Sequence, residues 1–498
     1  MSSMTRSAML GVSISAIVLS GCLSGGGGGS SSPPTQPTEP TPQEPVRPQQ
    51  QRINANFFTV NEAALPFAAF NPNPLAATPE IYANTSRWHG VLDGAGYRVE
   101  VPENWNGTLV MWAHGFRGEG PALTVDNPPM RQYLLDNGFA WAASTYSANF
   151  YDVRVGVEDT NKLALAFNDI AAANGRTLAA PTKYYISGVS MGGHIAGAAI
   201  EKETQETANN FVPYAAAAPM CGVMGDTKLF DYFTAYALAL YELADVGATS
   251  FPVSTADAIE KVGIARQRLW VDYAASKSTL TTQGQPLFNI VQNLTGGPRP
   301  IYNLAFGGFQ DLLQGFAGAD GTITGILNQS VVDTRNIVYR FEGLPGQPLT
   351  YFERVFNQNI IEAVPVANAN ALRDDGLRWI PKVNGELYAP IPVVTVHTLG
   401  DLFVPISMQQ IYRQRMEANN FGDMLVQRAV RAPGHCDFSL AEFTETFDAM
   451  VQWEQNDVKP AGDDLLNASL VASPSFGCQF TRNGFPQATT RAVMPPCP

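Results

Sequence analysis

The sequence predicts an α/β fold with a mostly parallel central sheet flanked by helices and a large, mainly helical cap insertion. Three observations predict it. Apolar, strand-like segments alternate with helical stretches in the first half of the chain, as expected of parallel strands joined by crossover helices. A Gly-x-Ser-x-Gly pentapeptide at 188–192 links one such segment to a helical pattern. The span 222–390 has helical periodicity and needs no further strand.

The elements follow in chain order. Strands are expected at 97–101, 109–113, 139–144, 183–189, 214–218 and 391–398, and a further apolar run lies at 424–430. Helices are expected at 159–174 and 194–201 between strands, and at 228–243, 255–273 and 301–313 in the cap. Some cap aromatics either form an apolar ceiling over a substrate or pack inside the cap: Tyr232, Phe233, Tyr236, Trp270 and Phe309.

The chain of 498 residues is too long for one domain of ordinary size, so an insertion is expected. The predicted boundaries are 1–21 for a signal peptide, 22–51 for a disordered tether, 52–221 and 391–462 for the α/β core, 222–390 for the cap, and 463–498 for a C-terminal appendage. The tether is rich in Gly, Ser, Pro and Gln, and has too few apolar groups to offset the entropy of ordering.

The amino terminus has a signal-like composition. Arg6 precedes an apolar stretch at 8–18 that is too short to span a bilayer, and a Leu-Ser-Gly-Cys motif ends at Cys22. This pattern resembles a bacterial lipoprotein signal, which implies cleavage before Cys22 and lipidation of that cysteine. The alternative is a plain secretory signal and a periplasmic or secreted protein. Because Leu23 follows the cysteine, the resemblance favours export to the outer membrane or cell surface.

The pentapeptide makes Ser190 the candidate nucleophile. A strand, a sharp Gly-flanked turn and a helix form the elbow that holds such a serine in a strained conformation at the carboxyl edge of a parallel sheet. A serine hydroxyl also needs an imidazole to accept its proton and a carboxylate to orient that imidazole, and in this fold the chain order is Ser, acid, His.

The general base is predicted to be His435. Of the five histidines, only His194, His397 and His435 follow the elbow. His435 alone lies in a loop signal directly after an apolar run. His397 falls inside a strand pattern, where a structural imidazole is expected, and His194 either packs on its helix or lines the mouth of the pocket.

The acid is predicted to be Asp401, because it closes the strand expected at 391–398. Asp437 is the competitor, but it lies two residues after the histidine and would need a loop reversal to reach it. The oxyanion donors are predicted to be the amides of Met191, which follows the nucleophile, and Phe116, with Gly115 as the alternative. His114 is expected to shape that second turn.

The order of His-Gly-Phe at 114–116, Gly-Val-Ser-Met-Gly-Gly at 188–193, Gly-Asp-Leu-Phe-Val-Pro at 400–405 and Pro-Gly-His-Cys-Asp at 433–437 resembles the α/β-hydrolase superfamily of serine hydrolases over about 97–453. The segment 218–222 and the pair His435-Cys436 are similar to secreted bacterial esterases. Tannase-like and feruloyl-esterase-like enzymes also put cysteine beside the histidine, but there its partner precedes the nucleophile, where this chain has Val189.

The resemblance implies an exported hydrolase of carboxylic esters that works through an acyl-enzyme, without a cofactor, on bulky aromatic, polyester or plant-derived esters. The same triad also serves an amidase or a prolyl-oligopeptidase-like peptidase. A non-catalytic surface protein that kept the fold for binding is the third hypothesis. The expected partners are a small-molecule or polymeric ester substrate and a lipid anchor in the membrane.

Export puts the chain where disulfides persist, and four cysteines remain beyond Cys22, which allow three pairings. We predict Cys221–Cys436, because both cysteines should lie at the active-site edge, and Cys478–Cys497 in the tail. A free, buried Cys436 is the alternative. No ligand pattern suggests a metal, and a formal net charge of −13 argues against nucleic acid as a partner.

Overall fold

The computed structural model describes residues 57–67, 84–322, 326–327, 329–343, 346–372, 376–482, 491 and 494–498. The chain divides into two units, Met1–Pro45 and Val46–Pro498, and all described residues belong to the second. The predicted signal peptide and tether, including Cys22, lie outside the described residues.

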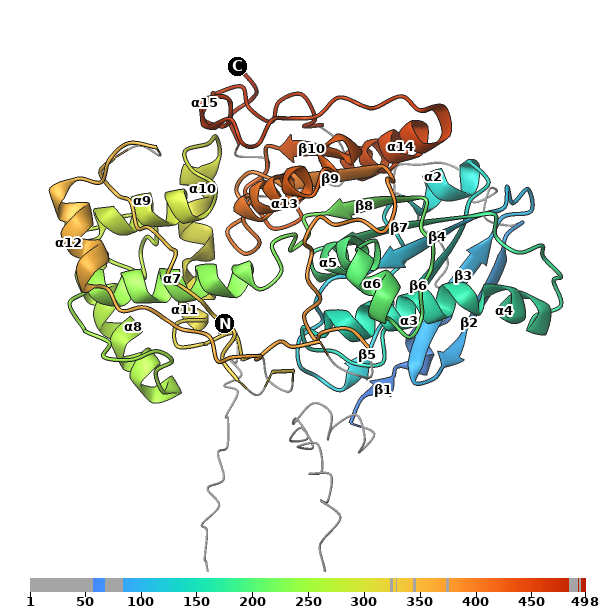
Figure 1. Cartoon of the computed structure of the whole chain (residues 1–498), viewed down its shortest axis with the longest axis horizontal. Coiled ribbons are helices and arrows are strands. Elements are labelled where there is room, and N and C mark those ends of the chain that lie inside the picture. Colours follow the sequence, from blue (N-terminus) through green and yellow to red (C-terminus); the bar gives the residue numbers. More distant parts are fainter. Residues whose placement is uncertain are drawn as a thin grey trace, which may run out of the picture. The chain divides into compact units, whose positions relative to one another are not determined.

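An eight-stranded sheet forms the centre of the described unit (Figure 1), in the order β10-β9-β8-β7-β4-β6-β3-β2. One strand, β3, runs opposite to the rest of the sheet: it pairs antiparallel with both β2 and β6, whereas the other pairs are parallel. The strands are β2 (Ser86–Leu92), β3 (Ala95–Val101), β4 (Thr108–Ala113), β6 (Ala140–Ser144), β7 (Lys183–Val189), β8 (Ala216–Met220), β9 (Val393–Thr398) and β10 (Leu425–Val430).

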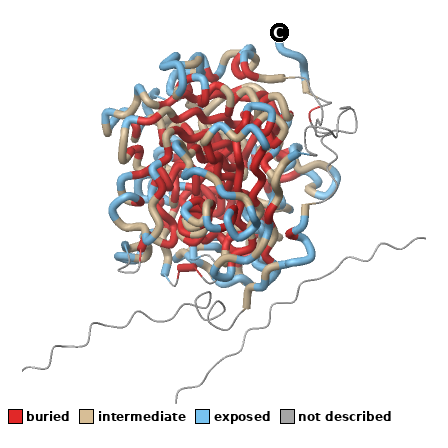
Figure 2. Tube along the Cα trace, turned by 90° about the vertical axis from the view of Figure 1, so that its right-hand side faces the viewer, coloured by how far each residue is buried: buried red, intermediate tan, exposed pale blue. Residues whose placement is uncertain are grey.

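Helices cover both faces of this sheet. Met111 of β4 packs in a cluster with α3 (Val153–Leu165) and α5 (Met191–Ala199). Its neighbours Val110 and Trp112 point into a second cluster, with α2 (Arg131–Asp136) and α14 (Leu440–Asn456). Successive side chains of a strand point to opposite faces, so a strand covered on both sides is apolar throughout. Figure 2 shows the buried residues concentrated in the interior of the unit.

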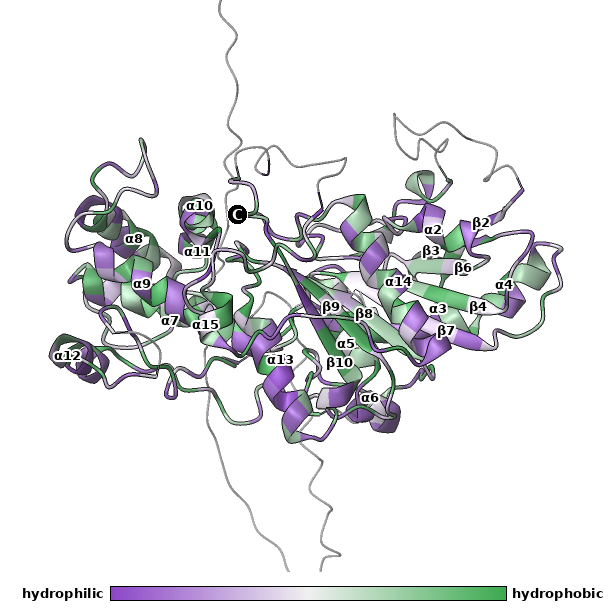
Figure 3. Cartoon of the chain, turned by 90° about the horizontal axis from the view of Figure 1, so that it is seen from above, coloured by the Kyte–Doolittle hydropathy of each residue, from purple (hydrophilic) through white to green (hydrophobic). Residues whose placement is uncertain are grey.

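The cap consists of helices between β8 and β9. These are α7 (Lys228–Leu243), α8 (Thr255–Leu269), α9 (Gln285–Leu294), α10 (Tyr302–Phe306), α11 (Gln310–Gly315) and α12 (Tyr351–Asn359). The helices α8, α9 and α11 pack on α7, which is buried over most of its length. In Figure 3 the outer helices α12 and α6 (Lys202–Thr207) have mostly hydrophilic colour, whereas the central strand β4 is hydrophobic.

Several element predictions were wrong in extent. The helix predicted at 159–174 is two helices, α3 and α4 (Phe167–Ala173), separated at Ala166. The helix predicted at 255–273 ends at Leu269, because Trp270 is extended and bridges to Leu280. The pattern at 301–313 forms two short helices with a 3₁₀ turn between them.

Some elements were not predicted at all. They include the edge strand β2, the helices α9, α12, α13 (Ser407–Ala418) and α14, and a two-stranded sheet of β1 (Thr59–Val60) and β5 (Ala122–Leu123). In the tail, α15 (Ala468–Val471) precedes the disulfide Cys478–Cys497, which the sequence predicted.

Candidate active site

Ser190 occupies a sharp turn between β7 and α5. Its backbone has φ 57° and ψ −122°, a strained conformation for a residue with a side chain. Two glycines allow the strand and the helix to approach so closely. A Cβ on Gly188 would lie 2.3 Å from the Gly192 oxygen, and one on Gly192 would lie 2.0 Å from the Ala113 oxygen. The hydroxyl is therefore presented at the carboxyl edge of the sheet, where β7 ends.

Ser190, His435 and Asp401 lie together although they are far apart in the sequence. The His435 Nε2 atom lies 2.8 Å from Ser190 Oγ, and its Nδ1 atom lies 2.5 Å from Asp401 Oδ2. Asp401 is fully buried, whereas the His435 side chain is 20% exposed. An ionised Asp401 can only accept, so Nδ1 carries a proton and Nε2 is left to accept the proton of the serine.

The turn that carries Asp401 is fixed from several directions. Asp401 Oδ1 accepts the amides of Phe403 and Val404, both at 2.9 Å. His397 donates Nε2–H to the Val404 carbonyl (2.6 Å), and its Nδ1 accepts from Gln409. His397 is therefore a buried structural imidazole, and burial lowers its pKa.

Two cap residues hold the same turn. Tyr232 of α7 donates its hydroxyl to the Leu402 carbonyl (3.0 Å), and the buried Arg299 donates Nε–H to the Leu399 carbonyl (2.6 Å). The side chain of Phe403 then packs edge-on against the His435 ring, with 5.2 Å between centroids. The cap thus takes part in positioning Asp401, which the sequence did not predict.

The loop that carries His435 is joined to β8 by the disulfide Cys221–Cys436, with 5.4 Å between the Cα atoms. This is the predicted pair, so the alternative of a free Cys436 is wrong. A hydrogen bond of 2.9 Å from Thr398 Oγ1 to the Gly434 carbonyl joins the loop to the end of β9. The loop that carries the imidazole is therefore joined to two neighbouring strands, β8 and β9.

The predicted oxyanion turn lies beside Ser190. A Cβ on Gly115 would lie 3.2 Å from Ser190 Cβ, and Phe116 lines the same pocket as Ser190. Met191 is the first residue of α5, where a helix leaves amides without an intrahelical acceptor. His114 is buried and stacks on Tyr146 (4.1 Å), whose hydroxyl donates to the His114 carbonyl. It shapes this turn as expected.

His194 lies behind the elbow and not in the pocket lining. Its Nε2 lies 2.8 Å from the Pro381 carbonyl, and its Nδ1 lies 2.9 Å from the Tyr151 hydroxyl. Burial lowers its pKa to about 4. The neutral ring therefore donates to Pro381 and accepts from Tyr151.

The elbow between β7 and α5, the mostly parallel sheet and the chain order Ser190, Asp401, His435 decide the fold. It is the α/β-hydrolase fold.

Comparison with known proteins gives few matches in sequence. An o-phthalyl amidase of Xanthobacter agilis is 33% identical over 84 residues, which are 17% of this chain and 18% of the amidase. The chain thus matches less than a fifth of the length of that relative. No model of a known protein family matches.

Matches to solved structures cover more of the chain. Feruloyl esterase B from Aspergillus oryzae has a TM-score of 0.40 at 16% identity, over 76% of this chain and 81% of that one. An acylaminoacyl peptidase of Pyrococcus horikoshii has a TM-score of 0.36 at 8% identity, over 78% of this chain and 44% of that one.

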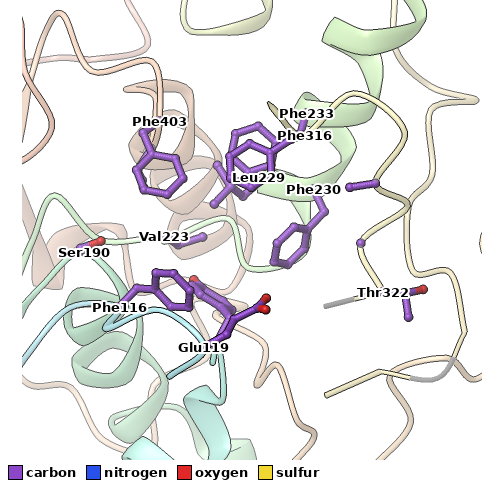
Figure 4. Close-up of a pocket in the computed structure, with 14 residues that line it drawn as sticks. Phe116, Glu119, Ser190, Val223, Leu229, Phe230, Phe233, Phe316, Thr322 and Phe403 are labelled. Carbon is purple, nitrogen blue, oxygen red and sulfur yellow. The ribbon is translucent and has the colours of Figure 1, made fainter. Parts of the chain in front are cut away.

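A pocket of about 220 Å³ opens beside Ser190 (Figure 4). Its walls come from the oxyanion turn, the acid turn and the cap, and they include Phe116, Phe230, Phe233, Phe316 and Phe403. Three of these rings are nearly parallel. Phe233 lies 4.7 Å from Phe316 and 6.1 Å from Phe403, with interplanar angles of 17° and 22°. The described wall beside Ser190 is therefore largely aromatic.

Of the five cap aromatics singled out in the sequence, only Phe233 lines this pocket. Tyr232 binds the acid turn, Tyr236 bonds to Gln310, and Trp270 is buried in the cap. Sequence reasoning missed four aromatic wall residues, although Phe403 lies only two positions beyond Asp401: Tyr151, Phe230, Phe316 and Phe403. Within the described ranges no cluster of three or more His, Cys, Asp or Glu could hold a metal, and no helix there could cross a membrane.

Proposed function

We propose that this chain is a serine hydrolase that cleaves carboxylic esters with an apolar, ring-bearing acyl or alcohol group. The observation that carries the proposal is the hydrogen-bonded chain from Ser190 through His435 to Asp401 at the edge of an aromatic pocket. Bulky aromatic, polyester and plant-derived esters are the classes that such a pocket favours.

The chemistry follows from the proton positions. As Ser190 Oγ attacks the ester carbonyl, its proton moves to His435 Nε2, and the amides of Phe116 and Met191 receive the negative charge of the tetrahedral intermediate. Collapse breaks the bond to the alcohol oxygen, which takes the proton from Nε2. Water then repeats the sequence on the acyl-enzyme, releasing the acid and restoring Ser190.

The second candidate is an amidase or a peptidase, because the same steps cleave an amide. The short match to an o-phthalyl amidase is compatible with it. An amide differs in its leaving amine, which departs only when His435 has protonated it.

The test compares aryl, alkyl and polymeric esters with matched amides, using protein that lacks residues 1–51 and its Ser190→Ala variant. Ester turnover that disappears in the variant supports the esterase, and amide-only turnover favours the second candidate. Turnover that persists in Ser190→Ala contradicts both. Failure of a fluorophosphonate to label Ser190 would favour the third hypothesis, a binding protein.

We also propose that the protein is exported and lipid-anchored through Cys22 at the outer membrane or cell surface. The Leu-Ser-Gly-Cys motif supports this, and the two disulfides agree with an oxidising compartment. Metabolic labelling with a palmitate analogue should mark the wild type and not a Cys22→Ala variant; equal labelling of both would reject the anchor.

A further inference from the structure

The described wall of the pocket beside Ser190 contains a single carboxylate. Among the described lining residues, Glu119 is the only acidic one, and none is lysine, arginine or histidine. Figure 4 shows its oxygens directed toward the side of the pocket formed by Phe230, away from Ser190. A substrate that reacts at Ser190 and fills the pocket therefore ends beside this carboxylate.

Glu119 has no counter-charge in the described part of the chain. No described residue forms a hydrogen bond or ion pair with its side chain, which is exposed at the mouth of the pocket. The cation closest in sequence, Arg117, is paired with Asp126. A neutral ligand that covered Glu119 would remove water from an ionised group without replacing it, which costs free energy.

A cationic ligand avoids this cost, because it pairs with the carboxylate, and it is also attracted by the aromatic rings of the pocket wall. The faces of aromatic rings attract ammonium groups within about 6 Å of the ring centroid, and Phe230, Phe233 and Phe316 all lie in the pocket wall. The attraction of Glu119 for a cation is stronger beside these apolar walls than in open water, because the local dielectric constant is lower.

We propose that the pocket selects esters that carry an ammonium group at the end remote from the scissile carbonyl, with Glu119 as the specificity-determining residue. This inference rests on the proposed function, because it requires that the ester reacts at Ser190. A substrate with a remote carboxylate is correspondingly disfavoured, since it meets a like charge in a pocket whose described wall has no cation.

The test uses two pairs of esters of matched shape. One pair is a choline ester and the dimethylbutyl ester in which carbon replaces the nitrogen, and the other is an aminohexanoate and a heptanoate aryl ester. We expect Glu119→Gln to lower the cationic-to-neutral ratio of kcat/KM about fivefold for one pair or both, equivalent to about 1 kcal/mol. The control is Glu260→Gln, which removes an equal charge from an exposed site on α8.

The outcomes separate this inference from the proposed function. Hydrolysis of the neutral esters that disappears in Ser190→Ala supports the hydrolase whatever the ratio does. An unchanged ratio in Glu119→Gln for both pairs, or an equal change in Glu260→Gln, overturns the inference alone. Calorimetry with tetramethylammonium applies even without turnover: weaker binding to Glu119→Gln supports the inference, and equal or absent binding to both proteins overturns it.

Discussion

The two carboxylate oxygens of Asp401 have different partners. Oδ1 accepts the amides of Phe403 and Val404 and so holds its own turn, whereas Oδ2 faces His435 Nδ1. One side chain therefore fixes both the backbone around it and the orientation of the imidazole. These two tasks can be separated by a substitution that keeps an acceptor at Oδ1.

We predict that Asp401→Asn lowers kcat by about 10³- to 10⁴-fold while the melting temperature changes little. Asparagine keeps the Oδ1 acceptor for the turn, but its amide donates to Nδ1 and moves the imidazole proton to Nε2, where it cannot accept from Ser190. Steady-state kinetics and thermal unfolding of the two proteins measure both effects.

Asp437→Asn is the matched control, because Asp437 was the competing acid. We expect it to retain most of the wild-type kcat. If Asp437→Asn lost activity and Asp401→Asn kept it, the hydrogen bond at Nδ1 would not identify the catalytic acid.

The sequence was informative about residues whose role depends on chain order and local pattern. Ser190, Asp401 and His435 each follow a strand, in the chain order that a triad of this kind requires, and closely spaced glycines mark the elbow, so these candidate residues could be named without coordinates. The residues of the pocket wall could not be found in this way. Phe116, Phe233 and Phe316 come from a loop, a cap helix and a helix end, and nothing in their local sequence indicates that they meet.

Among the elements, the strands were predicted better than the helices. A strand buried on both faces is a short apolar run, as at 183–189, and its extent is visible in the sequence. The predicted extent of a helix is wrong where tertiary contacts end the helix. Trp270 leaves α8 because its backbone is extended and its indole donates to the Lys277 carbonyl, and α14 keeps polar residues on its outer face that obscure its apolar side.

The loop of His435 is held to β8 by the disulfide Cys221–Cys436, whose partners are 215 residues apart. Closing so long a loop in the unfolded chain makes this bond worth up to about 5 kcal/mol. We predict that the double variant Cys221→Ser, Cys436→Ser loses stability and at least tenfold in kcat, because Cys436 adjoins the imidazole. Thermal unfolding and ester kinetics measure the two losses.

The second disulfide provides the comparison, since Cys478 and Cys497 are 19 residues apart and lie in the tail. Its removal should cost up to about 3 kcal/mol of stability and leave kcat unchanged. An equal effect of the two double variants on kcat would contradict a specific role of Cys221–Cys436 in holding His435.

Over the whole described unit, buried ionisable groups link stability to pH in opposite senses. Burial lowers the pKa of His114 and His194 to about 4, from 6.5. Burial raises the pKa of Asp159 to about 6 and that of Glu201 to about 8. Since these carboxyls hold protons that the unfolded chain releases, their contribution to stability is lost as pH rises to those values. The two histidines have the opposite effect: the unfolded chain binds protons that the folded chain does not, so stability is lost as the pH falls toward 4.

We predict that His194→Gln reduces the loss of stability on acidification. Between pH 6.5 and about 4 the unfolded chain binds a proton at residue 194 and the folded chain does not. As the pH is lowered through this range, the free energy of unfolding therefore decreases, by about 3 kcal/mol for this group. Glutamine can donate to the Pro381 carbonyl and accept from Tyr151, and it does not titrate. Denaturant unfolding at several pH values should therefore show that the free energy of unfolding decreases less steeply for the variant as the pH is lowered. An equally steep decrease in both proteins would mean that His194 is already protonated in the folded state and that its hydrogen bond with Tyr151 runs in the opposite direction.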